Sequence, residues 1–137
     1  MTKRAVLHYS AVVAATLFIT FIVGVIIIAD RADGPPFWTF INRIPWGDKV
    51  GHLGLIGTLS FLCNLAFRSR RWRYATLTTL VLLVLLTGEE ISQAFVPSRH
   101  LDLFDWLADL VGLAAGQWMA MKVRAWVRGG GLQPPCH

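Results

Sequence analysis

The chain alternates between long apolar runs and short polar connections. Four runs carry few charged residues, and they cover residues 5–29, 50–67, 74–95 and 104–127. A helix needs roughly 20 residues to cross the hydrocarbon core of a bilayer, and each run has about that length. The pattern predicts an all-α integral membrane protein with four transmembrane helices in one domain over residues 1–128, followed by a flexible glycine-rich tail over 129–137.

The first run is the longest of the four. Its 25 residues contain no Asp, Glu, Lys or Arg. A signal peptide is the alternative interpretation, because Lys3 and Arg4 give the chain a short basic start. The apolar part of a signal peptide has only about 7–15 residues, so we interpret the run as an uncleaved membrane anchor.

The basic residues predict the orientation of the four helices. Four arginines lie within the six residues of the connection 68–73. Short loops rich in Lys and Arg stay in the cytoplasm, and an even number of spans then places both termini there as well. This topology puts nine of the thirteen basic residues on the cytoplasmic side and all eight acidic residues outside. The predicted location is a membrane, with both ends of the chain on its cytoplasmic side.

Composition narrows the class of protein further. Hydrophobic residues make up 55% of the chain and charged residues 15%, which excludes a disordered protein or a basic nucleic-acid-binding protein. The net charge of +5 divides, in the predicted topology, into +9 inside and −4 outside. Two distant cysteines and the lack of a metal or dinucleotide motif predict no metal and no cofactor, although carboxylates could hold a divalent cation.

Ionisable residues continue into the predicted spans. A charged side chain in the bilayer costs roughly 2.5–3.5 kcal/mol on insertion scales, so it seldom faces lipid. Asp102, Asp105 and Asp109 share one stripe of the fourth helix, and small residues continue that stripe. Small residues let membrane helices touch, so the carboxylates should face the bundle interior. The glycines expected to allow such contacts are Gly51, Gly54, Gly57, Gly112 and Gly116.

The starts and ends of the other runs add polar groups at the same predicted depth. We therefore expect one polar layer at the outer face, with His52 level with both Glu90 and Asp105. A network of salt bridges that merely locks the bundle is the alternative interpretation. The expected layer comprises Asp48, Lys49, His52, Glu90, Gln93, Arg99, Asp102, Asp105 and Asp109.

These polar residues form a recognisable pattern between about residues 45 and 118. The segments are DKxxH from Asp48, ExxQ from Glu90, PxR ending at Arg99, and DxxDxxxDxxGxxxG from Asp102. Together they resemble the VanZ-like family of small bacterial membrane proteins, which usually has Asn where this chain has Asp109. The resemblance implies a protein of the cell envelope, associated with low-level resistance to teicoplanin-type glycopeptides, and it supplies no reaction.

One hypothesis for function is an enzyme, or a relic of one, that acts on an amphipathic envelope substrate. Glu90 and His52 would exchange protons, with Asp105 as a third catalytic candidate. Asp105 and Asp109 would orient the imidazole or hold a divalent cation through their oxygens. The substrate would be a phospholipid or a lipid-linked cell-wall intermediate. The residues expected to bind it are Arg99, Lys49, Gln93, Asp48, Asp102 and Asp109.

The second hypothesis is an accessory or binding protein without chemistry. It is favoured because no serine near the layer lies in a nucleophile motif. The same polar layer would then recognise a lipid headgroup, a glycopeptide or a partner protein, with no role for nucleic acid. An ion pathway is disfavoured because the carboxylates lie only on the outer side. The sequence leaves the oligomeric state open.

Overall fold

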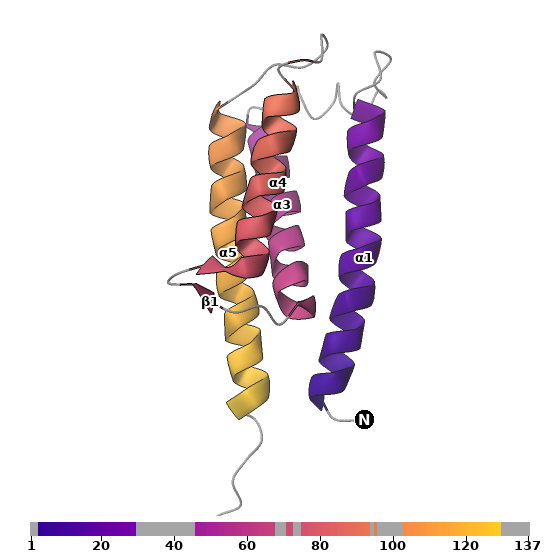
Figure 1. The fold of residues 1–137 in the computed structure, drawn as a ribbon, viewed down its shortest axis with the longest axis vertical. Coiled ribbons are helices and arrows are strands. Elements are labelled where there is room, and N and C mark those ends of the chain that lie inside the picture. Colours follow the sequence, from indigo (N-terminus) through magenta and orange to yellow (C-terminus); the bar gives the residue numbers. More distant parts are fainter. Residues whose placement is uncertain are drawn as a thin grey trace, which may run out of the picture.

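The computed structural model describes residues 3–29, 46–67, 71–72, 75–93, 95 and 103–129. Its elements are α1 (Lys3–Ala29), α3 (Gly47–Ala66), β1 (Arg71–Trp72), β2 (Ala75–Thr76), α4 (Leu77–Gln93) and α5 (Leu103–Gly129). Figure 1 shows α1 and α4 running in one direction and α3 and α5 in the other. The prediction of helices at the four apolar runs is confirmed. We call the end where α3 and α5 start the Lys49 end, and the opposite end the hairpin end.

The two central helices, α3 and α5, contact each other through their backbones. A Cβ atom added at Gly112 would lie 2.8 Å from the carbonyl oxygen of Leu53, and one at Gly116 would overlap the carbonyl oxygen of Gly57. Small residues therefore set the distance between the helices, as predicted. The prediction is wrong for Gly51 and Gly54, where an added Cβ meets no atom within 4 Å.

α1 lies at the edge of the bundle against α3. Ala11 and Ala15 are its buried residues, because these short side chains allow close contact with α3. The remaining surface of α1 is mostly apolar and largely exposed, as at Leu17 and Phe21. Among the described helices, α1 is the one that is long and apolar enough to cross a membrane, over Ala5–Ile28. The four predicted spans therefore rest, beyond α1, on the sequence pattern.

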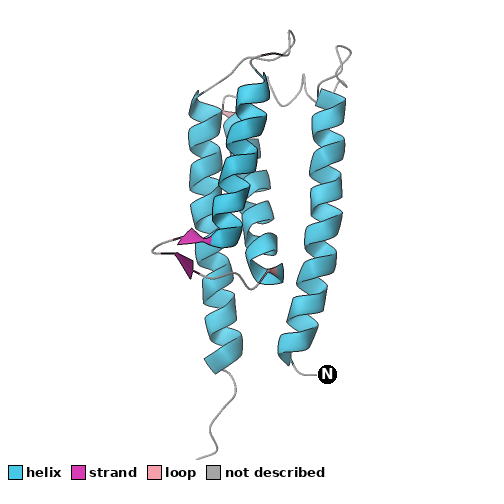
Figure 2. Cartoon of the chain, viewed as in Figure 1, coloured by secondary structure: helices cyan, strands magenta, loops and turns pink. Residues whose placement is uncertain are grey.

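A short hairpin precedes α4, where the sequence predicted the start of a helical span. Ala75 pairs with Trp72 and Thr76 pairs with Arg71 in an antiparallel arrangement, drawn in magenta in Figure 2. Thr76 then caps the helix, because its hydroxyl oxygen accepts a hydrogen bond of 3.2 Å from the backbone N–H of Thr79. α4 consequently begins at Leu77 rather than at residue 74.

A buried network of uncharged polar side chains joins α3, α4 and α5 towards the hairpin end. The Asn64 amide donates to Thr79 Oγ1 at 2.9 Å, and the Thr76 hydroxyl donates to Asn64 Oδ1 at 2.5 Å. The backbone N–H of Thr76 donates to Gln117 Oε1 at 2.9 Å, and the Ser60 hydroxyl donates to the carbonyl of Leu113 at 2.8 Å. The network gives these buried polar groups hydrogen-bond partners, without which their burial would destabilise the fold.

A second hydrogen bond fixes the register between α4 and α5. The indole N–H of Trp106 donates to the hydroxyl of Thr87 at 3.2 Å. This pair lies eleven residues along each helix from the Thr76–Gln117 pair, so both bonds define the same antiparallel register. In that register Glu90 lies level with Leu103.

Candidate functional site

Two pairs of ionisable side chains join α3 to α5 at the Lys49 end. Lys49 Nζ lies 2.9 Å from Asp105 Oδ1, and His52 Nδ1 lies 3.1 Å from Asp109 Oδ1. The pairs can form because α3 and α5 run in parallel, and each supplies two residues one turn apart on the same side. The structure brings these four predicted site residues together in two pairs, and their roles stay predictions.

Burial distinguishes the members of this group. Asp109 is 5% exposed and Glu90, from α4, is 4% exposed, whereas Lys49 and His52 are half-buried. Buried carboxyl groups require polar partners or a change in protonation. Three helices thus bring ionisable side chains into the bundle near one end.

The site has two levels instead of the single layer expected from the sequence. The register of α4 and α5 places Glu90 level with the start of α5, at about the depth of the Lys49–Asp105 pair. We call the Lys49–Asp105 pair the upper pair. The His52–Asp109 pair lies about one turn deeper, because His52 follows Lys49 by three residues and Asp109 follows Asp105 by four. A ligand that approaches from the Lys49 end therefore reaches the Lys49–Asp105 pair before the His52–Asp109 pair.

The contacts assign different roles to the two aspartates. A carboxylate that holds one nitrogen of an imidazole fixes the orientation of the ring and favours its tautomer. Asp109 is in this position, whereas Asp105, the expected catalytic candidate, contacts Lys49. Glu90 and His52 therefore remain the candidates for proton exchange, with Asp109 as the residue that orients His52.

The side chains of four predicted site residues lie outside the described part of the structure. Arg99 and Asp102 lie outside the described residues. Asp48 belongs to α3 and Gln93 to α4, but their side chains are also outside the described part of the chain. Their assignment to substrate binding stays a prediction. Among the described residues, no group of three or more His, Cys, Asp and Glu side chains could hold a metal ion.

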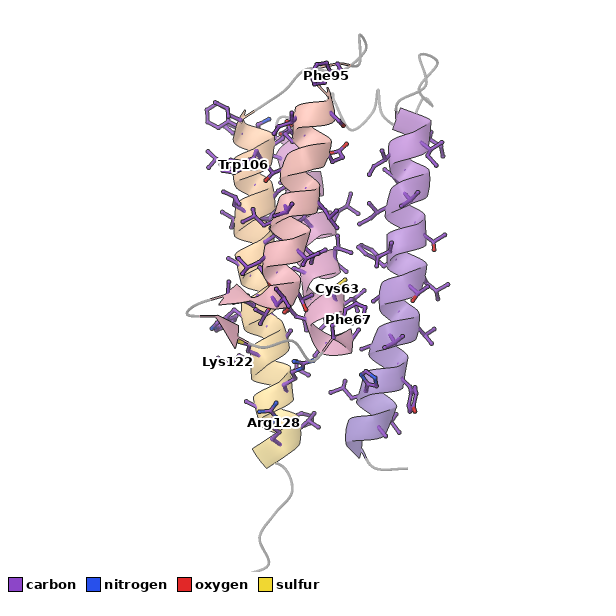
Figure 3. All side chains as sticks on the ribbon, viewed as in Figure 1. Cys63, Phe67, Phe95, Trp106, Lys122 and Arg128 are labelled. Carbon is purple, nitrogen blue, oxygen red and sulfur yellow. The ribbon has the colours of Figure 1, made fainter. Side chains whose placement is uncertain are left out.

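The contact between Trp106 and Thr87 was not expected from the sequence. Trp106 lies between Asp105 and Asp109 along α5, and Thr87 lies one turn before Glu90 on α4. Figure 3 shows Trp106 close to the Lys49 end, with Phe95 beyond it. This hydrogen bond therefore positions the helix that carries Glu90 against the helix that carries both aspartates.

Comparison with known proteins adds no identification. No family model, curated protein or solved structure matches the chain. The resemblance to VanZ-like proteins consequently rests on the motif residues themselves and stays a prediction. The structure defines the chain as a helical bundle with ion-paired, partly buried side chains at one end.

Proposed function

We propose that this chain is a bacterial inner-membrane protein whose polar site binds the headgroup of a membrane amphiphile. Its four helices span the membrane, both termini lie in the cytoplasm, and the Lys49 end faces outward. One observation carries the proposal: two ion pairs between α3 and α5, and the buried carboxyl group of Glu90 on α4, lie towards one end of a bundle that exposes large apolar residues along its sides. In water such sides would be unfavourable, whereas lipid would cover them.

The described surface supports insertion of more than α1. α4 exposes Val84 and Leu85, and α5 exposes Val111 and Met119. Several polar residues that lower the hydropathy of these helices are buried, among them Glu90, Asp109 and Gln117. An intramembrane helix in a bundle has this arrangement, with polar groups inward and apolar groups outward.

The site contains groups suited to a headgroup next to hydrocarbon. The Lys49 ammonium can bind a phosphate, and Asp105 holds that ammonium in place until a ligand competes for it. His52 and Glu90 can exchange protons with a hydroxyl or amine of the headgroup. Phospholipids and lipid-linked cell-wall precursors share this chemistry, since both carry a phosphate beside a long hydrocarbon chain.

The most direct test of chemistry compares lipid and cell-wall precursor profiles. The strains are wild type, a deletion, and Glu90→Gln, which keeps the shape of the side chain while removing its acidic proton. An enzyme predicts that one amphiphile accumulates equally in the deletion and in Glu90→Gln. Unchanged profiles in both strains would contradict processing and leave binding as the function to test.

A second candidate function is an accessory protein in which the charged residues only lock the bundle. The observation that favours it is that both ion pairs are formed within the chain. Buried ion pairs can specify a structure without adding much stability.

Exchanging the upper pair separates these two functions. Lys49→Asp combined with Asp105→Lys keeps an ion pair between α3 and α5 but moves the ammonium to α5. A lock predicts that the exchanged protein keeps both its stability and its cellular function. A headgroup site predicts recovered stability relative to either single variant, together with lost function.

The family resemblance has its own test. Expression in a susceptible bacterium should raise the concentration of teicoplanin that stops growth, and Lys49→Gln should remove this effect. An equal level of the variant in the membrane is the control. Unchanged susceptibility on expression of the wild type would contradict the link to glycopeptides while leaving the headgroup site untouched.

A further inference from the structure

The hairpin end has the opposite charge character to the Lys49 end. No Asp or Glu occurs between residues 50 and 88 or after Asp109, whereas Arg71 belongs to β1 and further basic residues lie in α5. Lys122 and Arg128 are exposed there, and Figure 3 shows both towards this end together with Phe67. The described acidic side chains lie at the Lys49 end. No carboxylate on this part of α5 therefore competes with an anionic ligand for Lys122 and Arg128.

α5 continues past the end of α3, as Figure 1 shows. Arg124 fixes this extension, because its Nη2 donates to the carbonyl oxygens of Leu65 at 3.1 Å and Phe67 at 3.0 Å. These are carbonyls at the carboxyl end of α3, where a cation is favourable. Arg124 is therefore engaged within the protein, whereas Lys122 and Arg128 extend from a helix that it holds in place.

Aromatic side chains accompany the two exposed cations. Lys122 Nζ lies 5.3 Å from the centre of the Trp118 ring, and Trp126 is 78% exposed. Tryptophan rings are enriched at the level of lipid headgroups, and long basic side chains reach the same level from an apolar helix. Rings and cations on one helix end thus match the boundary between hydrocarbon and phosphate.

We propose that the extension of α5 over residues 122–129 is a docking surface for anionic phospholipids of the cytoplasmic leaflet. The headgroup phosphates contact Lys122 and Arg128, and Trp126, which lies between them along α5, lies at the same headgroup level. This inference rests on the membrane insertion of the proposed function but does not involve the Lys49 site.

The test uses the full chain in nanodiscs that contain brominated phosphatidylglycerol or brominated phosphatidylcholine. Bromine quenches nearby tryptophan, and because the chain has six tryptophans, the part of the quenching that Trp126→Phe removes reports the lipid preference at this end. The wild type should bind phosphatidylglycerol preferentially at low salt. Lys122→Gln and Arg128→Gln should each reduce that preference about fivefold, because each removes one basic side chain from the anionic surface.

The matched controls are Lys122→Arg and Arg128→Lys, which keep the charges and should keep the preference. Lys49→Gln should also keep it, so failure of the headgroup site is distinguishable from failure of this surface. Circular dichroism verifies that each variant is folded. Equal quenching by the two lipids, or an undiminished preference after both charges are removed, would overturn the proposal. Tighter binding of soluble RNA than of phosphatidylglycerol would assign the surface to another partner and overturn it too.

Discussion

Gly116 occupies the point where the backbone of α5 touches that of α3. Gly116→Ala should destabilise the bundle by about 2 kcal/mol, because the new methyl group overlaps the Gly57 carbonyl and the helices must separate. Unfolding in mixed micelles measures the effect. Gly54→Ala is the control: its methyl group meets no neighbour, so it should be neutral or stabilising by up to about 1 kcal/mol. Equal destabilisation by both would contradict the contact.

Substitutions of Asp109 test whether the His52–Asp109 pair needs a negative charge or only a hydrogen-bond acceptor. Asp109→Asn keeps an acceptor for His52, so the free energy of unfolding should change by less than about 1 kcal/mol. Asp109→Leu removes the acceptor from a buried position and should cost about 2–3 kcal/mol. Both are measured at neutral pH by the same unfolding titration. A large loss with Asn would show that the ion pair itself holds the helices together.

At the scale of elements, the uncharged network decides how α4 joins the bundle. Asn64→Leu keeps the size of the side chain but removes the amide that contacts Thr76 and Thr79. We expect a loss of about 3 kcal/mol, since buried hydroxyl groups lose a partner. Thr58→Val is the control, because Thr58 is exposed and its hydroxyl bonds only within α3 to Gly54. A loss below 1 kcal/mol for Asn64→Leu would contradict a stabilising role.

The positions of the helices could be predicted because apolar runs of membrane length leave few alternatives. The helix starts could not, and the hairpin shows why: Ala75 and Thr76 are compatible with a helix, and only pairing with β1 excludes them from α4. The uncharged network also escaped prediction. Asn64 and Gln117 lie inside apolar runs, and their partners depend on the register between helices.

The ion-paired site was more predictable than the network. Spacing alone placed Lys49 and His52 on one side of α3 and Asp105 and Asp109 on one side of α5. Spacing could not determine which residue pairs with which, because that depends on how far one helix is shifted along the other. The close glycine contacts fix this shift, and they bring His52 to Asp109 rather than to Asp105.

At the scale of the whole molecule, the proposed topology can be tested by labelling cysteines in intact cells. In a chain with Cys63 and Cys136 replaced by serine, Leu103→Cys should react with a membrane-impermeant maleimide from outside. Arg128→Cys should react only after the cells are opened. Both positions are exposed in the structure, so burial does not explain a difference. Reaction of both from the same side would contradict the four-span topology.

The central claim is that the Lys49 end binds the headgroup of a specific amphiphile. Phe104 is exposed and precedes Asp105 on α5, so a photoreactive phenylalanine at this position can capture an amphiphile bound at the Lys49 end in living cells. Mass spectrometry of the adducts is the most direct measurement. The account predicts one amphiphile class, enriched over the bulk membrane and lost in Lys49→Gln. Adducts that match the bulk lipid composition and are unchanged in Lys49→Gln would contradict it.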